Sequence, residues 1–284
     1  KAFNKGFAVL SSPDVIKTLQ TLPGVASGTE LLSGMYVHGG TGSDNLFLLD
    51  GVPLYQVSHL AGLFSSFNTD IIDNVDFYKS GFPARYGSRM SSIVDVSTKD
   101  GDMQEYHGLF SIGLLDGRLQ FEGPIVKGRT SFNVAMRRSW IDVLSVPALA
   151  IVNGTMRDKT RLHYAFGDFN AKVTHLFAPD NKLTAAFYYG KDSFNFGFDY
   201  VGQYMYGELI PGGEDLTDSD GIELKWGNIL ASLRWQNRLT DQLSSDINAY
   251  YTKFSSGTEY HSYWWDHLGE EVFALEGAKE NGRS

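Results

Sequence analysis

Apolar residues near the start of the chain follow the period of a helix. Four of them fall at the spacing of one helix face: Val15, Ile16, Leu19 and Leu22. Ser11 or Ser12, just ahead of Pro13, offers a hydroxyl cap for the first turn, and Pro23-Gly24 ends the pattern. A short amphipathic helix is therefore predicted from about residue 15 to residue 22.

The next part of the chain changes to the period of strands. Leu46 to Leu49 is an apolar run typical of a buried strand, and residues 74–79 and 93–98 alternate apolar and polar positions. Asp50-Gly51 follows the apolar run and predicts a hairpin turn, because both residues tolerate positive φ. A first domain that combines a helix with a sheet is predicted, ending at the polar segment Lys99–Asp102.

Beyond Gln104 the chain consists of segments of about ten residues in which apolar and polar positions alternate. Strands are predicted near 106–114, 116–123, 129–138, 166–177, 182–193, 223–238 and 243–255. The fourth segment has an apolar face of Phe169, Ala171 and Val173 and a polar face of Asp168, Asn170, Lys172 and Thr174. Each strand thus has one apolar face and one face that tolerates water.

The connections between these segments fall into two classes. Tight turns are predicted at 123–128, 178–181 and 239–242, and they alternate with long loops at 139–165, at 194–222 and from 256 onward. Short turns on one side and long loops on the other are typical of a barrel in an outer membrane.

Composition narrows the class of protein. Apolar residues make up 42% of the 284 residues, which excludes disorder, and the net charge of −9 argues against binding of a phosphate backbone. The longest apolar runs, such as Val146–Val152, are far shorter than the roughly 20 residues that a membrane-spanning helix needs. A chain of this composition crosses a membrane only as a β-barrel. The absence of cysteine is compatible with an oxidising compartment but does not identify one.

Three blocks of the first domain occur in one order. A glycine turn at His38-Gly39-Gly40 precedes LFLLDGVPLY at 46–55, and IIDNVDFYKSGFPARYGSRMSSIVDVSTK follows at 71–99. Together they resemble the plug domain of TonB-dependent outer-membrane receptors, over roughly residues 8–100. The segment FPARYGSRMSSIVDV is more similar to the carboxypeptidase-regulatory-domain-bearing receptors of Bacteroidetes-type bacteria than to the starch-uptake type.

The resemblance implies an architecture in two parts. Residues 1–103 are expected to form an α+β plug domain, a small mixed sheet with helices. Residues 104–284 are expected to form the first seven or so antiparallel strands of an incomplete transmembrane β-barrel. Because transporters that hold a plug have barrels of about 22 strands, the chain is expected to be a fragment.

The resemblance also implies a function and a location. The expected function is TonB-dependent active import of a scarce nutrient across the outer membrane of a Gram-negative bacterium. The plug would gate the barrel and help to bind cargo at its outer apices. Expected partners are TonB, through a segment not identifiable in residues 1–7, outer-membrane lipids and a small-molecule, glycan or peptide cargo. A surface lipoprotein is considered as a further partner, and no cofactor and no nucleic acid are expected.

Two sets of site residues follow from the resemblance. Ligand contacts are expected at the plug apices: Gly28, Thr29, Glu30, Gly42, Ser43, Asp44, Asn45, Tyr55, Gln56 and His59. Contacts between plug and barrel are expected at His38, Lys79, Arg85, Arg89, Arg118 and Arg137. Receptors of this family usually have arginine where His38 stands, and a histidine that is mostly neutral near pH 7 weakens an ion pair there. For each residue, an ordinary solvated position is the simpler alternative.

Enzymatic chemistry finds no support in the sequence. His38-Gly39-Gly40 could form an oxyanion turn, but the chain has no Gly-x-Ser-x-Gly elbow. The histidines have no close pair at the spacing of metal ligands, and phosphate-binding and dinucleotide motifs are absent. No catalytic residue and no metal ligand is therefore predicted.

Two alternatives to a gated receptor stay open at this point. A secreted β-rich glycan-binding protein or hydrolase would use the loop aromatics, such as Trp140, Tyr200 and Trp264, as sugar platforms. A passive porin-like channel is disfavoured by the folded segment of about a hundred residues that precedes the strands.

Overall fold

The computed structural model describes most of the chain. The described residues are 8–9, 12–22, 25–27, 35–37, 45–79, 83, 86, 92–156, 158–201, 204–205, 208–209, 217–265, 271–276 and 280–283. The chain divides into two compact units. The first comprises Lys1–Arg138, Gly167–Gly190 and Asn228–Phe254, and the second Ser139–Phe166, Lys191–Gly227 and Ser255–Ser284. The boundary expected between residues 103 and 104 stays a prediction.

A four-stranded mixed sheet organises the N-terminal part of the first unit. Its order is β6-β5-β10-β9, with β5 at Asn45–Leu49, β6 at Val52–Pro53, β9 at Ile72–Tyr78 and β10 at Ser92–Thr98. β10 runs parallel to β5 and antiparallel to β9. The strands predicted at 46–49, 74–79 and 93–98 are confirmed, with ends shifted by one to two residues.

The turn between β5 and β6 has the predicted geometry. Asp50 has φ 51° and Gly51 has φ 78°, so both corner residues lie in the left-handed region. Two consecutive positive φ values are the requirement of a tight hairpin whose twist matches its strands. The local sequence Asp50-Gly51 thus determines this corner of the sheet.

The helix α1, at Val15–Gln20, packs one face into the core. The cap predicted at Ser11 or Ser12 is wrong, because Ser12 and Pro13 form the short strand β2, paired with β1 at Ala8–Val9. Asp14 caps the helix instead, and its Oδ1 accepts a hydrogen bond of 3.1 Å from Lys17 N. Its Oδ2 also accepts from Ser65 N at 2.6 Å, so this cap ties the helix to a distant strand.

The core of the first unit lies between α1 and one face of the mixed sheet. It contains Val15 and Ile16 from the helix and Val94 and Val96 from β10, all fully buried. The remaining buried apolar members include Leu19, Phe47, Leu49, Val52, Leu54, Phe67, Tyr188 and Leu230.

Small elements complete the described N-terminal part. They are β3 at Val25–Ser27, β4 at Met35–Val37, β7 at Ser58–His59, η3 at Leu60–Gly62, β8 at Phe64–Ser65 and η4 at Thr69–Ile71. β3 pairs with β4, and β7 pairs with β8. The segment 56–70 therefore contains a short hairpin, which its irregular apolar pattern does not predict.

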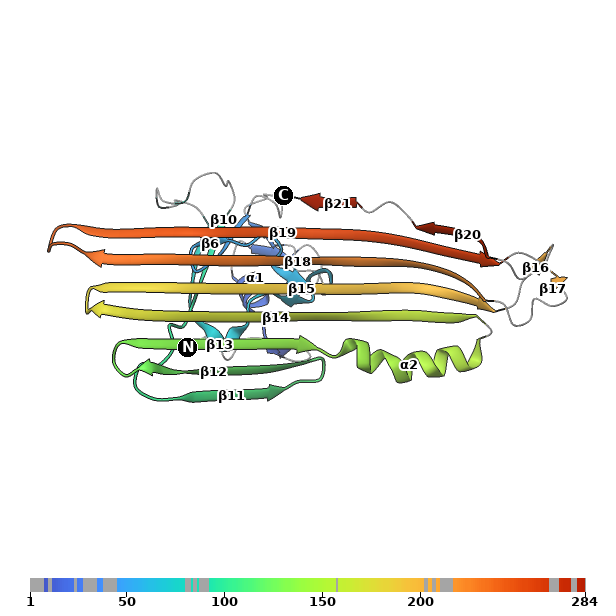
Figure 1. Ribbon diagram of the computed structural model, residues 1–284, viewed down its shortest axis with the longest axis horizontal. Helices are drawn as coiled ribbons and strands as arrows, with labels where there is room; N and C mark the ends of the chain where they lie inside the picture. Colours follow the sequence, from blue (N-terminus) through green and yellow to red (C-terminus); the bar gives the residue numbers. More distant parts are fainter. Residues whose placement is uncertain are drawn as a thin grey trace. The chain divides into compact units, whose positions relative to one another are not determined.

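The second sheet has the order β11-β12-β13-β14-β15-β18-β19-β20, and β21 also pairs with β19. Figure 1 shows its strands following one another along the sheet. The bounds are β11 His107–Ile112, β12 Asp116–Val126, β13 Thr130–Ser139, β14 Lys159–Ala178, β15 Asn181–Val201, β18 Thr217–Arg238, β19 Ser244–Trp265, β20 Glu271–Glu276 and β21 Glu280–Arg283. A separate short pair consists of β16 at Tyr204–Met205 and β17 at Glu208–Leu209.

The strands from β14 onward are longer than predicted. The loops expected at 139–165, at 194–222 and from 256 onward are partly strand, because β14, β15, β18 and β19 extend into them. The alternation fades in these extensions, where both apolar and charged runs occur, but backbone pairing with a neighbouring strand does not require an apolar face. The prediction of long loops is therefore wrong in extent.

The loop predicted at 139–165 also contains a helix, α2, at Ile141–Thr155. Asn153 holds it to the following strand, since its Nδ2 donates to Thr160 O at 3.0 Å and its Oδ1 accepts from Thr160 N at 2.8 Å. The sequence does not predict this helix, because Pro147 lies inside it and Trp140 provides no side-chain cap. Among the described helices, none combines the length and apolar character needed to cross a membrane.

The polar faces of the long strands are buried and the apolar faces are exposed. On β14, Asp168, Asn170, Lys172 and Thr174 are all buried, whereas Val173 is 41% exposed. The same inversion occurs on β13, where Asn133 and Arg137 are buried and Met136 is 48% exposed. This is the reverse of a sheet in a soluble protein, and it is the pattern of barrel strands with a polar interior and an apolar outer surface. The predicted fold class, an α+β domain followed by antiparallel strands of an incomplete barrel, is confirmed.

Candidate functional site

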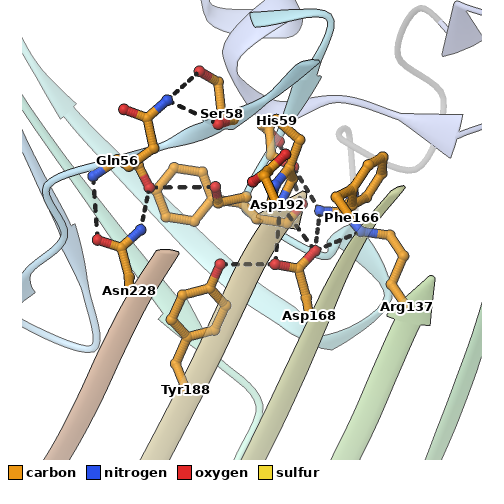
Figure 2. Close-up of polar contacts among 12 residues, drawn as sticks. Gln56, Ser58, His59, Arg137, Phe166, Asp168, Tyr188, Asp192 and Asn228 are labelled. Carbon is orange, nitrogen blue, oxygen red and sulfur yellow. Dashed lines mark hydrogen bonds and ion pairs between the residues drawn. The ribbon is translucent and has the colours of Figure 1, made fainter. Parts of the chain in front are cut away.

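A buried ionic cluster forms around Asp168, on the polar face of β14 (Figure 2). Arg137 Nε donates to Asp168 Oδ2 at 2.9 Å, and His59 Nε2 lies 3.0 Å from Oδ1. Tyr188 donates its hydroxyl to Oδ1 at 2.8 Å. The Asp168 side chain is fully buried, so its charge depends on these partners rather than on water.

The strand geometry explains how the cluster assembles. Arg137 on β13 stands opposite Asp168 on β14 in the antiparallel register, which places both side chains on the same face. His59 and Ser65 come from the β7–β8 hairpin of the N-terminal part, and Arg137 also donates to Ser65 O at 2.6 Å. The cluster thus joins this hairpin to the inner face of three neighbouring strands, β13, β14 and β15.

In a second contact, the side chain of Asn228 binds the backbone of Gln56. Asn228 Nδ2 donates to Gln56 O at 2.7 Å, and its Oδ1 accepts from Gln56 N at 3.3 Å. Figure 2 shows Asn228 facing Gln56 in this paired arrangement, with the Gln56 amide turned toward Ser58. Both backbone groups of Gln56 are therefore satisfied by one residue of β18.

A third contact centres on Lys172. Its Nζ lies 3.0 Å from Asp50 Oδ1 and 2.7 Å from Thr98 O, at the ends of β5 and β10. It also lies 3.2 Å from Asp100 Oδ1, and Lys182 approaches the other oxygen of Asp100 at 2.9 Å. Burial by itself raises the pKa of Asp100, but the two lysines outweigh burial and hold that pKa below its ordinary value.

Arg118 makes a fourth contact of the same kind. Its NH1 donates to Asp70 Oδ2 at 2.8 Å, and both side chains are largely buried. On β19, Thr252 donates its hydroxyl to Pro53 O at 2.9 Å. Strands from β12 to β19 thus contribute polar side chains that bind residues 50–100.

The chemistry of these contacts would allow the N-terminal part to be held by the strands and also to separate from them. Most of them are hydrogen bonds and ion pairs rather than apolar packing, and several reach the backbone of the N-terminal part. Polar contacts can be exchanged for contacts with water when two surfaces separate, which apolar burial does not allow. Within the described residues, no group of three or more His, Cys, Asp or Glu side chains is arranged to hold a metal ion.

The structure locates some of the expected interface residues. Arg118 and Arg137 pair with Asp70 and Asp168 as described above. Lys79 has its Nζ 5.8 Å from the centre of the Phe77 ring. His38, Arg85 and Arg89 lie outside the described residues.

The expected ligand residues are spread over different environments. Tyr55 is 49% exposed, whereas Asn45 and His59 are buried, which differs from an open apex. Asn45 lies in β5, and its side-chain oxygen accepts a hydrogen bond of 2.6 Å from the Ser92 hydroxyl across the parallel pair β5–β10. Gln56 faces Asn228. Gly28, Thr29, Glu30, Gly42, Ser43 and Asp44 lie outside the described residues.

Four residues at the centre of these contacts are not among the predicted sites. They are Asp50, Asp168, Lys172 and Asn228. A signal for two of them exists in the sequence, because Asp168 and Lys172 are charged residues on the polar face of a predicted strand. Such a position is costly in a barrel lumen unless a partner stands opposite, so a charge there points to a contact.

One family model matches the N-terminal part of the chain. Residues 8–93 match the family described as TonB-dependent Receptor Plug Domain. Among curated protein sequences, none matches the chain significantly.

Several solved structures are similar in fold. The outer membrane transporter YddB from Escherichia coli has 12% identity and a TM-score of 0.46, over 95% of this chain and 50% of that one. The siderophore receptor PirA from Acinetobacter baumannii has 12% identity and a TM-score of 0.43, over 91% of this chain and 53% of that one. FpvA of P. aeruginosa, in complex with a pyoverdine and iron, has 12% identity and a TM-score of 0.44, over 96% and 45%. The chain spans about half the length of these structures.

Residues 8–93 thus match the plug domain of TonB-dependent receptors. The resemblance seen in the sequence is confirmed, while the likeness to Bacteroidetes receptors stays a prediction.

Proposed function

We propose that this chain takes part in TonB-dependent import of a scarce nutrient across the outer membrane, with the plug as the gate. The observation that carries the proposal is the buried cluster of His59, Arg137 and Asp168, which joins the plug to the polar face of the strands. We assign the plug to residues 1–103 and the barrel strands to residues 104–284.

A gate must close the pore and still be able to move. The contacts at Asp168, Lys172, Asn228 and Arg118 fit this requirement, because they hold the plug at several points through polar groups. Arg118 and Arg137 are proposed as residues of the interface between plug and barrel. Force transmitted by TonB would break a limited number of such contacts and expose the freed groups to water in the pore.

The outer surface of the strands supports a lipid environment. Leu119 is 46% exposed, Met136 48% and Val173 41%, and each of these side chains stands next to a buried polar position on its strand. A secreted, soluble β-rich protein would not leave so many large apolar side chains on one face of its sheet. Outer-membrane lipids are therefore the proposed partner of this surface.

Cargo is proposed to bind on the side of the plug where the apex residues stand. Tyr55 is the exposed member of that set. Gly28, Thr29, Glu30, Gly42, Ser43 and Asp44 are proposed as ligand contacts, while Asn45, Gln56 and His59 are proposed to support that surface from beneath. A small molecule, a glycan and a peptide all fit this proposal, and TonB and a surface lipoprotein are its proposed protein partners.

Growth of a deletion strain tests the proposal. The strain would be grown on single sources of iron, vitamin and glycan: a ferric chelate, cobalamin and an oligosaccharide. We expect a growth defect on one source, rescue by the wild-type gene, and no rescue when TonB is absent. Rescue that is independent of TonB would overturn energised import.

Neutral substitutions at the interface give a second test in the same strain. Arg118→Gln and Arg137→Gln, placed in the chromosomal gene, are expected to alter nutrient uptake or to admit a large antibiotic through the pore. The Lys225→Gln substitution removes an exposed ion pair with Glu223 and is a matched control. Uptake and leakage equal to wild type in both arginine variants would count against the gate.

A further inference from the structure

A row of aromatic rings runs along the end of β15, in the second unit. Phe194, Phe196, Phe198 and Tyr200 occupy alternate positions, so their side chains leave the same face of the strand. Their ring centres lie 6.5, 5.1 and 6.3 Å apart in chain order, so each ring is close enough to interact with the next. We call these four residues the β15 ladder.

The pattern of apolar and polar positions on β15 inverts near Lys191. Before this residue the odd-numbered positions are apolar, and Phe187 and Tyr189 are exposed like the surface proposed to face lipid. After it, Asn195 and Asp199 occupy odd-numbered positions, and the aromatic rings occupy the even-numbered ones. A strand whose outward face becomes polar has left the apolar band of the membrane. The β15 ladder is therefore not part of the lipid-facing surface.

A polar network on three neighbouring strands identifies the opposite face. Arg161 of β14 has its Nε 3.2 Å from Asp199 Oδ1, and its NH2 donates to Ser219 of β18 at 2.7 Å. Ser219 in turn donates to Asp199 Oδ1 at 3.0 Å, so the three side chains share one face of the sheet. Asp199 lies between Phe198 and Tyr200 in the sequence, which places the β15 ladder on the other face.

The face that carries the β15 ladder also carries negative charge. Asp192 stands two residues before Phe194 on this face, and it is buried and accepts from the Tyr164 hydroxyl. Asp218 and Asp220 flank Ser219 on β18 and therefore stand on this face as well. Asp220 accepts from the Ser262 hydroxyl. In the described part of the second unit, no lysine or arginine stands on this face of β14, β15 or β18.

The exposure and shape of the β15 ladder indicate a binding surface. Phe198 is 37% exposed and Tyr200 39%, outside the part of the strand that lipid would cover. A contiguous apolar patch left in water is unfavourable, and such patches usually mark a site of interaction. Rings on alternate residues of one strand form a long narrow strip, which matches an elongated molecule with several flat apolar faces better than a compact one.

We infer that the β15 ladder is a binding strip for a neutral oligosaccharide. Each sugar ring has a flat face of C–H groups that stacks on an aromatic ring, and hydroxyl groups that donate to carboxylates or to the Tyr200 hydroxyl. Anionic ferric chelates are disfavoured by the aspartates on the same face. The inference rests on the proposed function, because it names the class of cargo that is imported.

Binding to the purified full-length receptor tests the inference without transport. Calorimetric titration is performed with four neutral hexasaccharides, which are cellohexaose, mannohexaose, xylohexaose and maltohexaose, and with a ferric tris-catecholate and haem as compact anionic probes. We expect at least one hexasaccharide to bind, and to bind more tightly than its trisaccharide, because a longer chain contacts more rings. If no hexasaccharide binds, the inference is overturned, whether or not a chelate binds.

Matched variants assign the binding to the β15 ladder. Phe196→Ala and Phe198→Ala should each weaken the binding of the hexasaccharide by about tenfold, because each removes one stacking surface. Phe198→Trp keeps a ring and should retain most of the affinity. Phe187→Ala removes an exposed ring from the opposite face of the same strand and should leave the affinity unchanged. Sugar binding that is insensitive to Phe196 and Phe198, or equally sensitive to Phe187, would contradict the assignment.

Growth of cells separates this inference from the proposed function. The deletion strain would carry the gene with Phe196→Ala and Phe198→Ala together, and would be grown on the oligosaccharide that binds, on a ferric chelate and on cobalamin. We expect a growth defect on the oligosaccharide alone. A defect on the ferric chelate or on cobalamin, with normal growth on the oligosaccharide, would overturn the assignment of cargo while leaving TonB-dependent import intact.

Discussion

The strands contact the plug in two different ways. Along β13, β14 and β15 the contacts are buried charges with complete partners, centred on Asp168 and Lys172. On β18 and β19, Asn228 and Thr252 also bind the plug, but around Arg234 and Asp246 the wall faces a hollow of about 670 Å³, and that ion pair is 35% and 46% exposed. The same alternation of polar and apolar positions therefore supports a tight contact in one place and an open one in another.

Burial of the charges, rather than their number, decides how much each wall contributes to the stability of the contact with the plug. A charge pair in contact with water has a small net effect, because each partner is also well hydrated when alone. Breaking a buried pair leaves one charge without water and without a partner, which costs several kcal/mol. We therefore expect the buried charges of β13 and β14 to anchor the plug more firmly than the exposed pair of Arg234 and Asp246 does.

The largest effect is expected for Asp168→Asn. The change leaves the buried Arg137 without its carboxylate and should lower the free energy of unfolding by about 3–5 kcal/mol. Calorimetry of the purified receptor measures it, with Asp246→Asn on the open wall as the matched control. Equal shifts in the two variants would contradict the distinction between the walls.

Lys172→Met should have the next largest effect. The ammonium binds Asp50, Asp100 and the carbonyl of Thr98, and hydrogen bonds to charged groups contribute about 1.5–3 kcal/mol. The same calorimetric measurement applies. Lys182→Met is the control, since Lys182 pairs with Asp100 but is 33% exposed, and a loss as large as that of Lys172 would argue against anchoring by burial.

Acid should weaken the anchored wall through Asp100. Its pKa in the folded protein lies below the ordinary value of 3.8, so its stabilisation is complete above that pH and is lost as the pH falls through the folded pKa. The thermal midpoints of wild type and Asp100→Asn should differ at about pH 6, and the difference should shrink as the pH falls below 3.8. A difference that stays constant across this range would show that the charge of Asp100 is not responsible.

The smallest effect is expected for Arg234→Met on the open wall. An exposed pair contributes about 0.2–1 kcal/mol, so the thermal midpoint should move little. Arg118→Met removes a largely buried pair with Asp70 and should shift the midpoint more. If Arg234→Met proved the more damaging of the two, the exposed pair of Arg234 and Asp246 would have to be a structural contact.

Local features of the fold were predictable from the sequence. The corner at Asp50-Gly51 follows from its φ requirement, and the separation of a polar from an apolar face on β14 follows from strict alternation. Arg118 and Arg137 could be selected because they stand on polar faces of predicted strands. Their partners could not, since local patterns carry no information about which distant residue stands opposite.

The features that differ from the predictions depend on contacts between residues that a local pattern does not relate. His59 was expected at an open apex, but it is buried against Asp168, 109 residues further along the chain. The helix α2 lacks a side-chain cap and contains Pro147, so its position depends on Asn153 binding Thr160 of the next strand. In both cases a contact outside the local pattern decides the structure.

The corner residue Asp50 has a double duty that limits what can replace it. Its backbone turns the chain at φ 51°, while its carboxylate accepts from Thr98 N at 2.9 Å and from Lys172 at 3.0 Å. Glycine would turn more easily but would remove the carboxylate that pairs with Lys172. Asparagine would offer Lys172 only a neutral amide. The corner between β5 and β6 is thereby also a point of attachment, so a redesign that tightened the turn at the expense of the carboxylate would loosen the plug from β14.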